Sequence, residues 1–251
     1  MLDLGVTMNE SQTVFITGAS GGIGKEVVLK FAAEGWDILC HYCSSDAFIT
    51  ELGGIITGDL KRSFKAFKAD FTKEDEVNNL VAKISKFKID SFINNAGGYI
   101  EPVHYSELNY QKLIKTFSLN AFAPMMIMTE IFKGMKSRNF GRIVNVGSIA
   151  SKYGGSPNSM DYGSAKASME SVVKIFAREG ASSNVLVNTV RLGVIDTDAH
   201  KKFPKDMSKR VELIPMKRMG TAKEVSEVLY FLGSNKNTYI TNEVITAAGG
   251  E

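Results

Sequence analysis

Val14-Phe15-Ile16-Thr17-Gly18-Ala19-Ser20-Gly21-Gly22-Ile23-Gly24 is the stretch of sequence that decides the fold. A short apolar run of strand type passes through a glycine-rich turn into a segment of helical period. Glycines allow a tight turn, let the backbone approach a pyrophosphate and permit close packing of helix on strand. The helix N-terminus behind the turn offers free N–H groups and a positive dipole end. This order predicts a dinucleotide-binding loop at the first βα junction.

Apolar runs alternate with helical segments along the rest of the chain, as in βαβ units. We therefore predict an α/β protein, namely a single-domain Rossmann fold whose doubly wound, seven-stranded parallel sheet carries helices on both faces. The expected strands are Thr13–Thr17, Asp37–Tyr42, Phe64–Lys68, Ser91–Asn94, Arg142–Val146, Leu186–Val190 and Glu243–Ala247. The expected helices are Ile23–Glu34, Glu74–Lys86, Tyr110–Ser137, Tyr162–Ser182 and Ala222–Gly233.

The segment Ser45–Ser63 fits this alternation poorly, although a crossover helix belongs there. Its glycines Gly53, Gly54 and Gly58 interrupt the helical period, and each costs about 1 kcal/mol in a helix interior. We expect a short or broken helix in this segment.

Length and charge limit the class of protein. A chain of 251 residues with no internal linker or repeat suits one catalytic domain over 12–251, preceded by a disordered tail over 1–11. A net charge of +3 gives no reason to expect nucleic acid or an anionic membrane as a partner. No apolar run is long enough to span a bilayer, and the start of the chain does not resemble a signal peptide. We expect a cytoplasmic protein.

The two cysteines, Cys40 and Cys43, form a CxxC at the end of an expected strand. A redox or metal site would place such a pair at a helix N-terminus or add a second pair of ligands. We expect two reduced, partly buried thiols and no metal.

The spacing Gly-x-x-x-Gly-x-Gly of the first loop resembles that of the short-chain dehydrogenase/reductase family, and further motifs follow in the family's order. They are Asp70, Asn94-Asn95-Ala96-Gly97, Asn120, Ser148, Tyr162-Gly163-Ser164-Ala165-Lys166 and Gly193-Val194-Ile195-Asp196-Thr197. The resemblance covers nearly the whole chain. It implies an NAD(P)-dependent oxidoreductase that interconverts a carbonyl and an alcohol. The cofactor residues implied are Gly18, Ser20, Gly21, Gly22, Ile23, Gly24, Tyr42, Ser44, Ser45, Asp70, Phe71, Asn95, Ala96, Gly97, Tyr162, Lys166, Gly193, Ile195 and Thr197.

Tyr162 and Lys166 are four residues apart and share a helix face. In the family, this tyrosine exchanges a proton with the substrate oxygen, and the lysine lowers its pKa and holds the nicotinamide ribose. A nearby ammonium, together with the positive nicotinamide ring of the oxidised complex, is expected to bring a phenol pKa down from about 10. The resemblance also implies that Ser148 hydrogen-bonds the substrate oxygen and that Asn120 holds a water on the proton path.

The choice between NADP and NAD depends on the end of the second strand. An acid there would bind the ribose 2′-OH and repel a 2′-phosphate, but the position reads Tyr42, and the Ser44-Ser45 that follows could donate to a phosphate. The basic residue that many NADP-using members place in the loop is replaced by Gly21. Lys25 or His41 is expected to compensate. We favour NADP, with NAD as the alternative.

The nearest relatives in pattern are 3-oxoacyl-[acyl-carrier-protein] reductases. Where these present two arginines to the acidic carrier, this chain has Asn139 and Ser183, with Arg138 and Lys136 close to the first. A sugar or another small carbonyl compound is therefore an alternative substrate. A non-catalytic cofactor-binding scaffold is the alternative from another class.

Three further expectations concern the surroundings of the site. The segment near 198–215 is expected to act as a substrate lid. The usual proline before Gly193 is Leu192 here, preceded by Arg191, and we expect nicotinamide binding to survive this change. Apolar residues on the long helices predict a homotetramer, or a dimer, through the helices Tyr110–Ser137 and Tyr162–Ser182.

Overall fold

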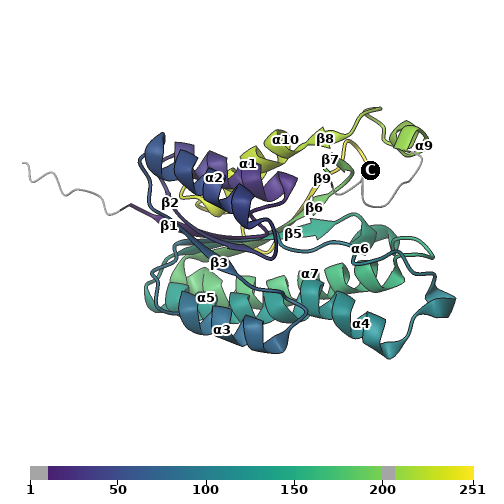
Figure 1. The fold of residues 1–251 in the computed structure, drawn as a ribbon, viewed down its shortest axis with the longest axis horizontal. Coiled ribbons are helices and arrows are strands. Elements are labelled where there is room, and N and C mark those ends of the chain that lie inside the picture. The colour runs from purple at the N-terminus through teal and green to yellow at the C-terminus, as the bar shows by residue number, and fades with distance from the viewer. Residues whose placement is uncertain (1–10, 199–206) are drawn as a thin grey trace, which may run out of the picture.

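The computed structural model describes residues 11–198 and 207–251. Its seven-stranded parallel sheet has the order β3-β2-β1-β4-β5-β6-β9, which confirms the predicted fold class (Figure 1). The strands are β1 (Thr13–Thr17), β2 (Asp37–Tyr42), β3 (Phe64–Lys68), β4 (Ser91–Asn94), β5 (Gly141–Ser148), β6 (Val185–Leu192) and β9 (Val244–Ala247). The order reverses between β1 and β4, and in such sheets ligands bind outside the carboxyl ends of the strands at this point.

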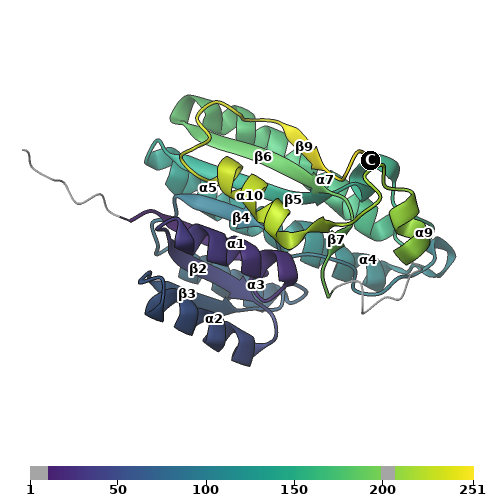
Figure 2. The ribbon, with the colours of Figure 1, turned by 90° about the horizontal axis from the view of Figure 1, so that it is seen from above.

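Helices cover both faces of the sheet (Figures 1 and 2). One face carries α1 (Gly22–Ala33), α2 (Asp46–Gly58) and α10 (Ala222–Gly233), and the other carries α3 (Glu74–Ile84), α4 (Tyr110–Phe117), α5 (Ala123–Ser137) and α7 (Met160–Gly180). Shorter elements are α6 (Ala150–Tyr153), α9 (Met207–Glu212), the 3₁₀ turns Tyr105–Glu107 and Ala181–Ser183, and the paired two-residue strands β7 (Ile195–Asp196) and β8 (Gly220–Thr221). α6, α9, β7 and β8 lie at the end of the molecule toward which the parallel strands run.

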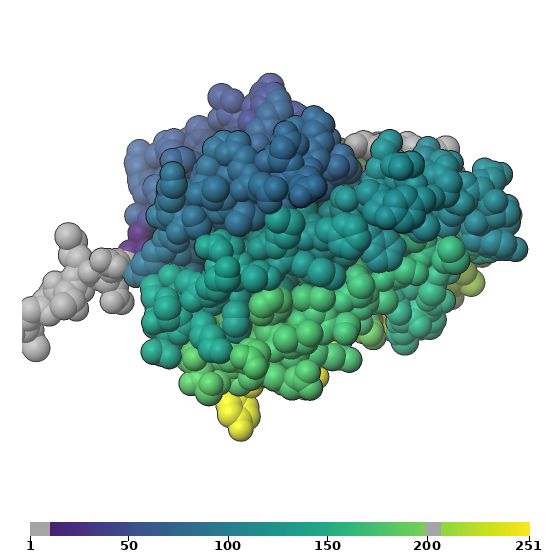
Figure 3. All heavy atoms as spheres, turned by 90° about the horizontal axis from the view of Figure 1, so that it is seen from below, coloured from purple at the N-terminus to yellow at the C-terminus, as the bar shows by residue number. Residues whose placement is uncertain are grey.

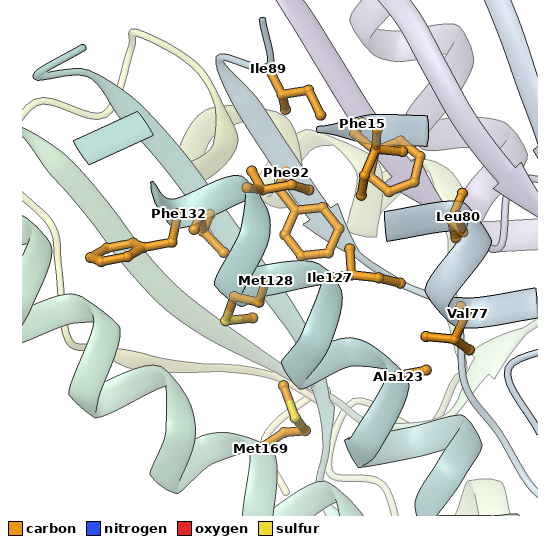
Figure 4. Close-up of a cluster of buried hydrophobic side chains, with 14 of the residues drawn as sticks. Phe15, Val77, Leu80, Ile89, Phe92, Ala123, Ile127, Met128, Phe132 and Met169 are labelled. Carbon is orange, nitrogen blue, oxygen red and sulfur yellow. The ribbon is translucent and has the colours of Figure 1, made fainter. Parts of the chain in front are cut away.

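Two apolar cores form because alternate side chains of each strand point to opposite faces. In β1, Phe15 belongs to the core under α3, α5 and α7, while its neighbours Val14 and Ile16 belong to the core under α1, α2 and α10. The ring of Phe15 stacks on that of Phe92 with centroids 5.8 Å apart, and both are fully buried (Figure 4). β1 is thus fixed from both sides, which holds the glycine loop at its end in place.

The predicted break in the second crossover helix is wrong, because α2 runs without interruption from Asp46 to Gly58. Ile49, Leu52 and Ile56 are buried on one face of this helix. At Gly53 an added Cβ would lie 2.9 Å from the ring of Phe64, so the glycine is required for close packing on β3. Burial of the apolar face outweighs the low helix propensity of glycine.

The expected helix Tyr110–Ser137 is interrupted. α4 ends at Phe117, five residues form a π-helical turn (Ser118–Phe122), and α5 starts at Ala123. Single π turns inside helices are frequent at functional sites. Asn120 lies in the middle of this one.

Other bounds agree with prediction to within three residues at each end. Of the expected tail, residues 1–10 lie outside the described residues, and so do residues 199–206 of the expected lid.

Candidate active site

The glycine loop packs directly on the segment that follows β4. Gly18 has φ +72°, and an added Cβ would lie 2.9 Å from Cα of Ala96. At Gly24 the added Cβ would lie 2.1 Å from the carbonyl oxygen of Gly18, so a side chain is excluded there. The two glycines therefore serve the tight turn and the helix contact that the sequence predicted.

The N-terminus of α1 has the features that a diphosphate needs. Its cap residue Gly21 makes no side-chain capping bond, and the first turn holds no acidic residue. Gly22 lies against Thr197, because an added Cβ would be 3.0 Å from the methyl group of that threonine. The loop expected to hold the nicotinamide carboxamide thus meets the expected phosphate loop. Uncapped N–H groups and a positive dipole end fit the dinucleotide predicted for this site.

Thr17 organises this junction, although the sequence analysis did not single it out. Its hydroxyl accepts hydrogen bonds from the backbone N–H groups of Asn95 and Ala96, both at 3.0 Å. The Asn95 side-chain amide donates to the carbonyls of Thr17 at 2.9 Å and Gly18 at 3.2 Å. Asn95 and Ala96 thus lock the end of β1 to the end of β4.

Two residues predicted to act together, Asn120 and Lys166, meet at Gly97. This glycine has φ +149°, and an added Cβ would lie 2.7 Å from Oδ1 of Asn120 and 2.9 Å from Nζ of Lys166. Asn120 Oδ1 accepts from the N–H of Gly98 at 2.9 Å, and its amide donates to the Gly98 carbonyl at 3.0 Å. The π turn therefore delivers the buried Asn120 side chain to the segment after β4.

Ser148, Tyr162 and Lys166 form the rest of the predicted constellation. Ser148 ends β5, and its side chain lies close enough to the Tyr162 hydroxyl on α7 to act on the pKa of that phenol. Lys166, one turn further along α7, is buried, and its Nζ donates to the carbonyl of Val146 at 3.0 Å. The same Nζ lies 5.9 Å from the centre of the Tyr162 ring. Together with Asn120, the structure gathers all four predicted catalytic residues.

The ionisation expected for Tyr162 is reversed. Loss of solvation raises the pKa of the half-buried Tyr162 to about 12, although Ser148 beside its hydroxyl acts in the opposite direction. Burial also lowers the pKa of Lys166 to about 8. Desolvation penalises a phenolate and an ammonium alike. The protein alone therefore shifts both side chains toward their neutral forms, although Lys166 stays mainly charged at neutral pH, and the protein by itself does not lower the tyrosine pKa as we expected.

Tyr99 is a site residue that the sequence analysis missed. Its ring lies 4.2 Å from the ring of Tyr162, tilted by 33°, and its hydroxyl lies near the side chain of Ser159. The loop that carries it is joined to the loop before α7 by two backbone bonds, from Val103 N–H to Asn158 at 3.2 Å and from Tyr105 N–H to Pro157 at 2.9 Å. In the sequence, the feature that could have indicated Tyr99 is an aromatic residue two positions after Gly97.

The residues expected to bind the adenosine half of the cofactor follow β2. The hydroxyl of Tyr42 donates to Asp46 at 2.8 Å, and Lys68 on β3 pairs with the same carboxylate at 2.6 Å. Ser44 and Ser45 are exposed next to them. Lys25 lies 5.5 Å from the ring of Phe48.

His41 is not the compensating cation that we expected. It is buried, its Nδ1 accepts the N–H of Gly18 at 3.3 Å, and its Nε2 lies 2.9 Å from the carbonyl oxygen of Ala69. Burial lowers its pKa to about 4, so the ring is neutral at physiological pH. Its ring stacks on Phe71 at 4.0 Å. His41 is a neutral link between the glycine loop and the end of β3.

Asp70 and Gly193 are expected to lie at the two ends of the cofactor site. Asp70 accepts from the N–H and hydroxyl of Thr72 at 2.9 and 2.7 Å. Burial alone would raise the pKa of the Asp70 carboxyl, but the hydrogen bonds from Thr72 outweigh burial, and the pKa lies below its usual value. Gly193 donates its N–H to Ala247 at 3.0 Å, and an added Cβ would lie 2.8 Å from Ala248. Ile195, in β7, pairs with Gly220.

Other sequence expectations can be checked on the described residues. Both thiols are free, but only Cys40 is buried, since Cys43 is exposed. Burial raises the pKa of Cys40 to about 12. Within the described ranges, no group of three or more His, Cys, Asp or Glu side chains could hold a metal ion. No helix in these ranges has the length and apolar character of a membrane span.

Comparison with known proteins agrees with this geometry. A family model described as "Enoyl-(Acyl carrier protein) reductase" matches residues 18–251. The chain is 32% identical to the 3-oxoacyl-[acyl-carrier-protein] reductase FabG of Thermotoga maritima over 249 residues, which are 96% of this chain and 98% of that protein. It is 31% identical to FabG of Buchnera aphidicola subsp. Schizaphis graminum over 250 residues, 96% of this chain and 97% of the relative.

Solved structures give the same answer. YwfH, an NADPH-dependent reductase involved in bacilysin biosynthesis, superimposes with a TM-score of 0.88 at 26% identity, over 96% of this chain and 98% of YwfH. A blue fluorescent protein from a metagenomic library, in complex with NADPH, also gives 0.88 at 25% identity, over 95% and 97% of the two chains. The sequence, the fold and the arrangement around Tyr162 lead to one assignment. This chain belongs to the short-chain dehydrogenase/reductase family.

Proposed function

We propose that this oxidoreductase uses NADPH to reduce a carbonyl compound to an alcohol, with Tyr162 as the general acid. The observation that carries the proposal is that the centre of the Tyr162 ring, with Ser148 beside its hydroxyl, lies 5.9 Å from Nζ of Lys166, which meets Asn120 at Gly97. When bound, the nicotinamide supplies the hydride, and the protein supplies geometry and protons.

Each side chain has a task that its surroundings support. A protonated Tyr162, favoured by its high pKa, donates the proton that the substrate oxygen needs. Ser148 hydrogen-bonds the same oxygen and stabilises its developing charge. Lys166 holds the nicotinamide ribose and passes a proton toward Tyr162, while Asn120 fixes the path behind it.

NADP remains our preferred cofactor, and NAD the alternative. The FabG-type relatives and the NADPH-bound neighbour support it, as does the absence of an acid at Tyr42. Asp46 lies nearby, but Lys68 pairs with it and offsets its charge. Because His41 is neutral, the groups that would bind a 2′-phosphate are Ser44, Ser45, Lys25 and Lys68.

A 3-oxoacyl thioester on a carrier protein is the first candidate substrate, on the strength of the FabG relatives. A specific observation favours a free small carbonyl compound such as a sugar derivative. The two cations that could replace the missing carrier-binding arginines are already engaged. Arg138 donates to the carbonyl of Ile89 at 2.6 Å, and Lys136 pairs with Glu179 at 3.1 Å.

We also propose a homotetramer or dimer built on the face shown in Figure 3, where α4, α5 and α7 lie side by side. Phe122 at the end of the π turn, Met126 on α5 and Ile175 on α7 are 44%, 39% and 53% exposed, respectively. Apolar side chains gathered on one face are typical of subunit contacts. A lid near 198–215 and a cytoplasmic location remain predictions.

Oxidation of NADPH with a panel of ketones, sugar derivatives and 3-oxoacyl thioesters tests the function. Tyr162→Phe should abolish turnover and leave NADPH binding intact, because only the acid is removed. Retained turnover in Tyr162→Phe would refute the assignment of the acid. Bound NADPH without turnover of any substrate would favour the scaffold, and a sharp gain from a carrier protein would favour the acyl reductase.

A further inference from the structure

A buried ion pair lies one helical turn beyond Lys166 and is not used by the reaction as described. Glu170 on α7, with 9% of its side chain exposed, accepts two hydrogen bonds from Arg191 at the end of β6. They run from Nε to Oε1 at 2.7 Å and from an NH2 nitrogen to Oε2 at 2.6 Å. The Ser151 hydroxyl donates to Glu170 as well. A bidentate charged pair of this kind fixes orientation as well as adding energy.

The three residues of this network surround Ser148. Ser151, three residues after it in α6, places its hydroxyl 2.6 Å from the carbonyl oxygen of Ser148. Arg191 directly precedes Leu192, the partner of Ser148 in the pairing of β5 with β6. The network therefore joins α6, α7 and β6 at the one strand end that carries Ser148.

Gly147, the residue before Ser148, makes room for the carboxylate. An added Cβ there would lie 3.5 Å from Oε1 of Glu170 and 2.8 Å from the methyl group of Thr189. Arg191 is the register partner of this glycine on β6. Glu170 thus packs against the backbone immediately next to Ser148.

The direction of the Ser148 hydroxyl depends on this backbone. Its Oγ accepts from the N–H of Ala150 at 3.1 Å and lies beside the Tyr162 hydroxyl, close enough to act on the pKa of that phenol. A shift of the strand end or of the first turn of α6 would therefore move the hydroxyl away from Tyr162. We propose that Glu170, with Arg191 and Ser151, is the positioning group that aims Ser148 at Tyr162 and at the substrate oxygen.

One departure from the family pattern is explained by this proposal. The position before Gly193 lacks the usual proline, and Arg191 precedes it. An ion pair to α7 then supplies the rigidity that a proline would give this strand end. The proposal rests on the proposed function, because the task of Ser148 is to bind the substrate oxygen.

Glu170→Gln is the direct test, measured both in the wild-type background and in Ser148→Ala. We expect kcat to fall roughly tenfold or more, because misplacement of a reacting group by about 1 Å can cost a hundredfold. The Kd of NADPH, from its fluorescence, should change less than about twofold. In the Ser148→Ala background the same substitution should have little further effect, since groups that act through one another are not additive.

Glu179→Gln is the matched control on the same helix, because it removes an exposed pair with Lys136 at 3.1 Å. It should leave kcat unchanged. If Glu170→Gln does not fold, Ser151→Ala removes a milder part of the network and should lower kcat in the same Ser148-dependent way. An equal loss of kcat with and without Ser148 would overturn the proposal, as would an unchanged kcat in a folded variant.

A second readout needs no substrate and separates this proposal from the proposed function. In protein labelled with ¹³C at tyrosine Cζ, the Tyr162 resonance is identified by its loss in Tyr162→Phe. Glu170→Gln should move this resonance in the same direction as Ser148→Ala, because both weaken the Ser148–Tyr162 contact. An unmoved resonance would overturn the positioning role. A failure of the wild-type protein to reduce any carbonyl would overturn the proposed function alone.

Discussion

Lys166→Met should change how the stability of the protein depends on pH. Burial lowers the pKa of Lys166 from 10.5 to about 8, while in the unfolded chain the lysine keeps its ordinary value. The folded state thus favours the neutral amine. Below pH 8 this group opposes folding, because the folded state must hold a buried ammonium. As pH rises from 8 to 10.5, the unfolded chain binds more protons than the folded one, so stability increases.

The magnitude follows from the two pKa values. The difference between 10.5 and about 8, at about 1.4 kcal/mol per pKa unit, corresponds to about 3 kcal/mol. Lys166 is 4% exposed, so little of this is lost to solvent screening. The hydrogen bond from Nζ to the carbonyl of Val146 brings no negative charge to oppose it. The wild-type protein should therefore gain about 3 kcal/mol across this interval relative to Lys166→Met.

Urea unfolding at several pH values between 7.5 and 10.5, on both proteins without cofactor, measures this difference. Cys40 and Tyr162, whose pKa values burial raises to about 12, lower stability at the upper end of the range in both proteins and cancel in the comparison. Lys136→Met removes an exposed lysine from a surface pair and serves as the control. A difference that stays flat from pH 8 to 10.5 would refute the lowered pKa of the buried Lys166 amine, on which the reasoning rests.

Three further substitutions test separate parts of the site. Gly24→Ala should abolish cofactor binding and destabilise the fold, since its Cβ would lie 2.1 Å from a backbone oxygen. Gly54 on α2 faces open space, so Gly54→Ala should stabilise the folded protein by about 0.5–1 kcal/mol in thermal unfolding. Burial lowers the pKa of His41 to about 4, so between pH 6.5 and 4 the ring is protonated in the unfolded chain but not in the folded protein. The protein should therefore lose stability as pH falls through this range, and His41→Gln should lack this dependence in acid titrations followed by circular dichroism. Tyr99→Ala should raise kcat/KM for bulky ketones relative to small ones, because it removes the ring that covers one face of Tyr162, and Tyr99→Phe should behave like the wild type.

The sequence could predict the elements that depend on local pattern. The glycine loop, the sheet and the spacing of Tyr162 and Lys166 all follow from residues close together in the chain. The continuity of α2 could not be predicted, because the fit of Gly53 against Phe64 is a contact with a later strand. The π turn at Asn120 was hidden for a similar reason: its bonds to Gly98 come from another element.

Charge was harder to predict than position. The sequence places His41 beside an expected phosphate, where a cation would be useful, but only the structure shows that both ring nitrogens are engaged within a closed core. The same limit applied to the pair on α7. Four residues of spacing show that Tyr162 and Lys166 share a face, but not how little water reaches them. Solvation depends on everything packed around a group, and no local pattern records that.

The order of the two pKa values bears on the direction of the reaction. Because Lys166 loses its proton at about pH 8 and Tyr162 only at about 12, the phenol is protonated throughout the physiological range. A protonated phenol is the form that carbonyl reduction consumes, whereas alcohol oxidation needs the phenolate. At neutral pH Lys166 is still mainly charged and can return a proton to Tyr162 after each turnover. The protonation of the buried pair thus favours reduction, which agrees with the NADPH-dependent role proposed for the chain.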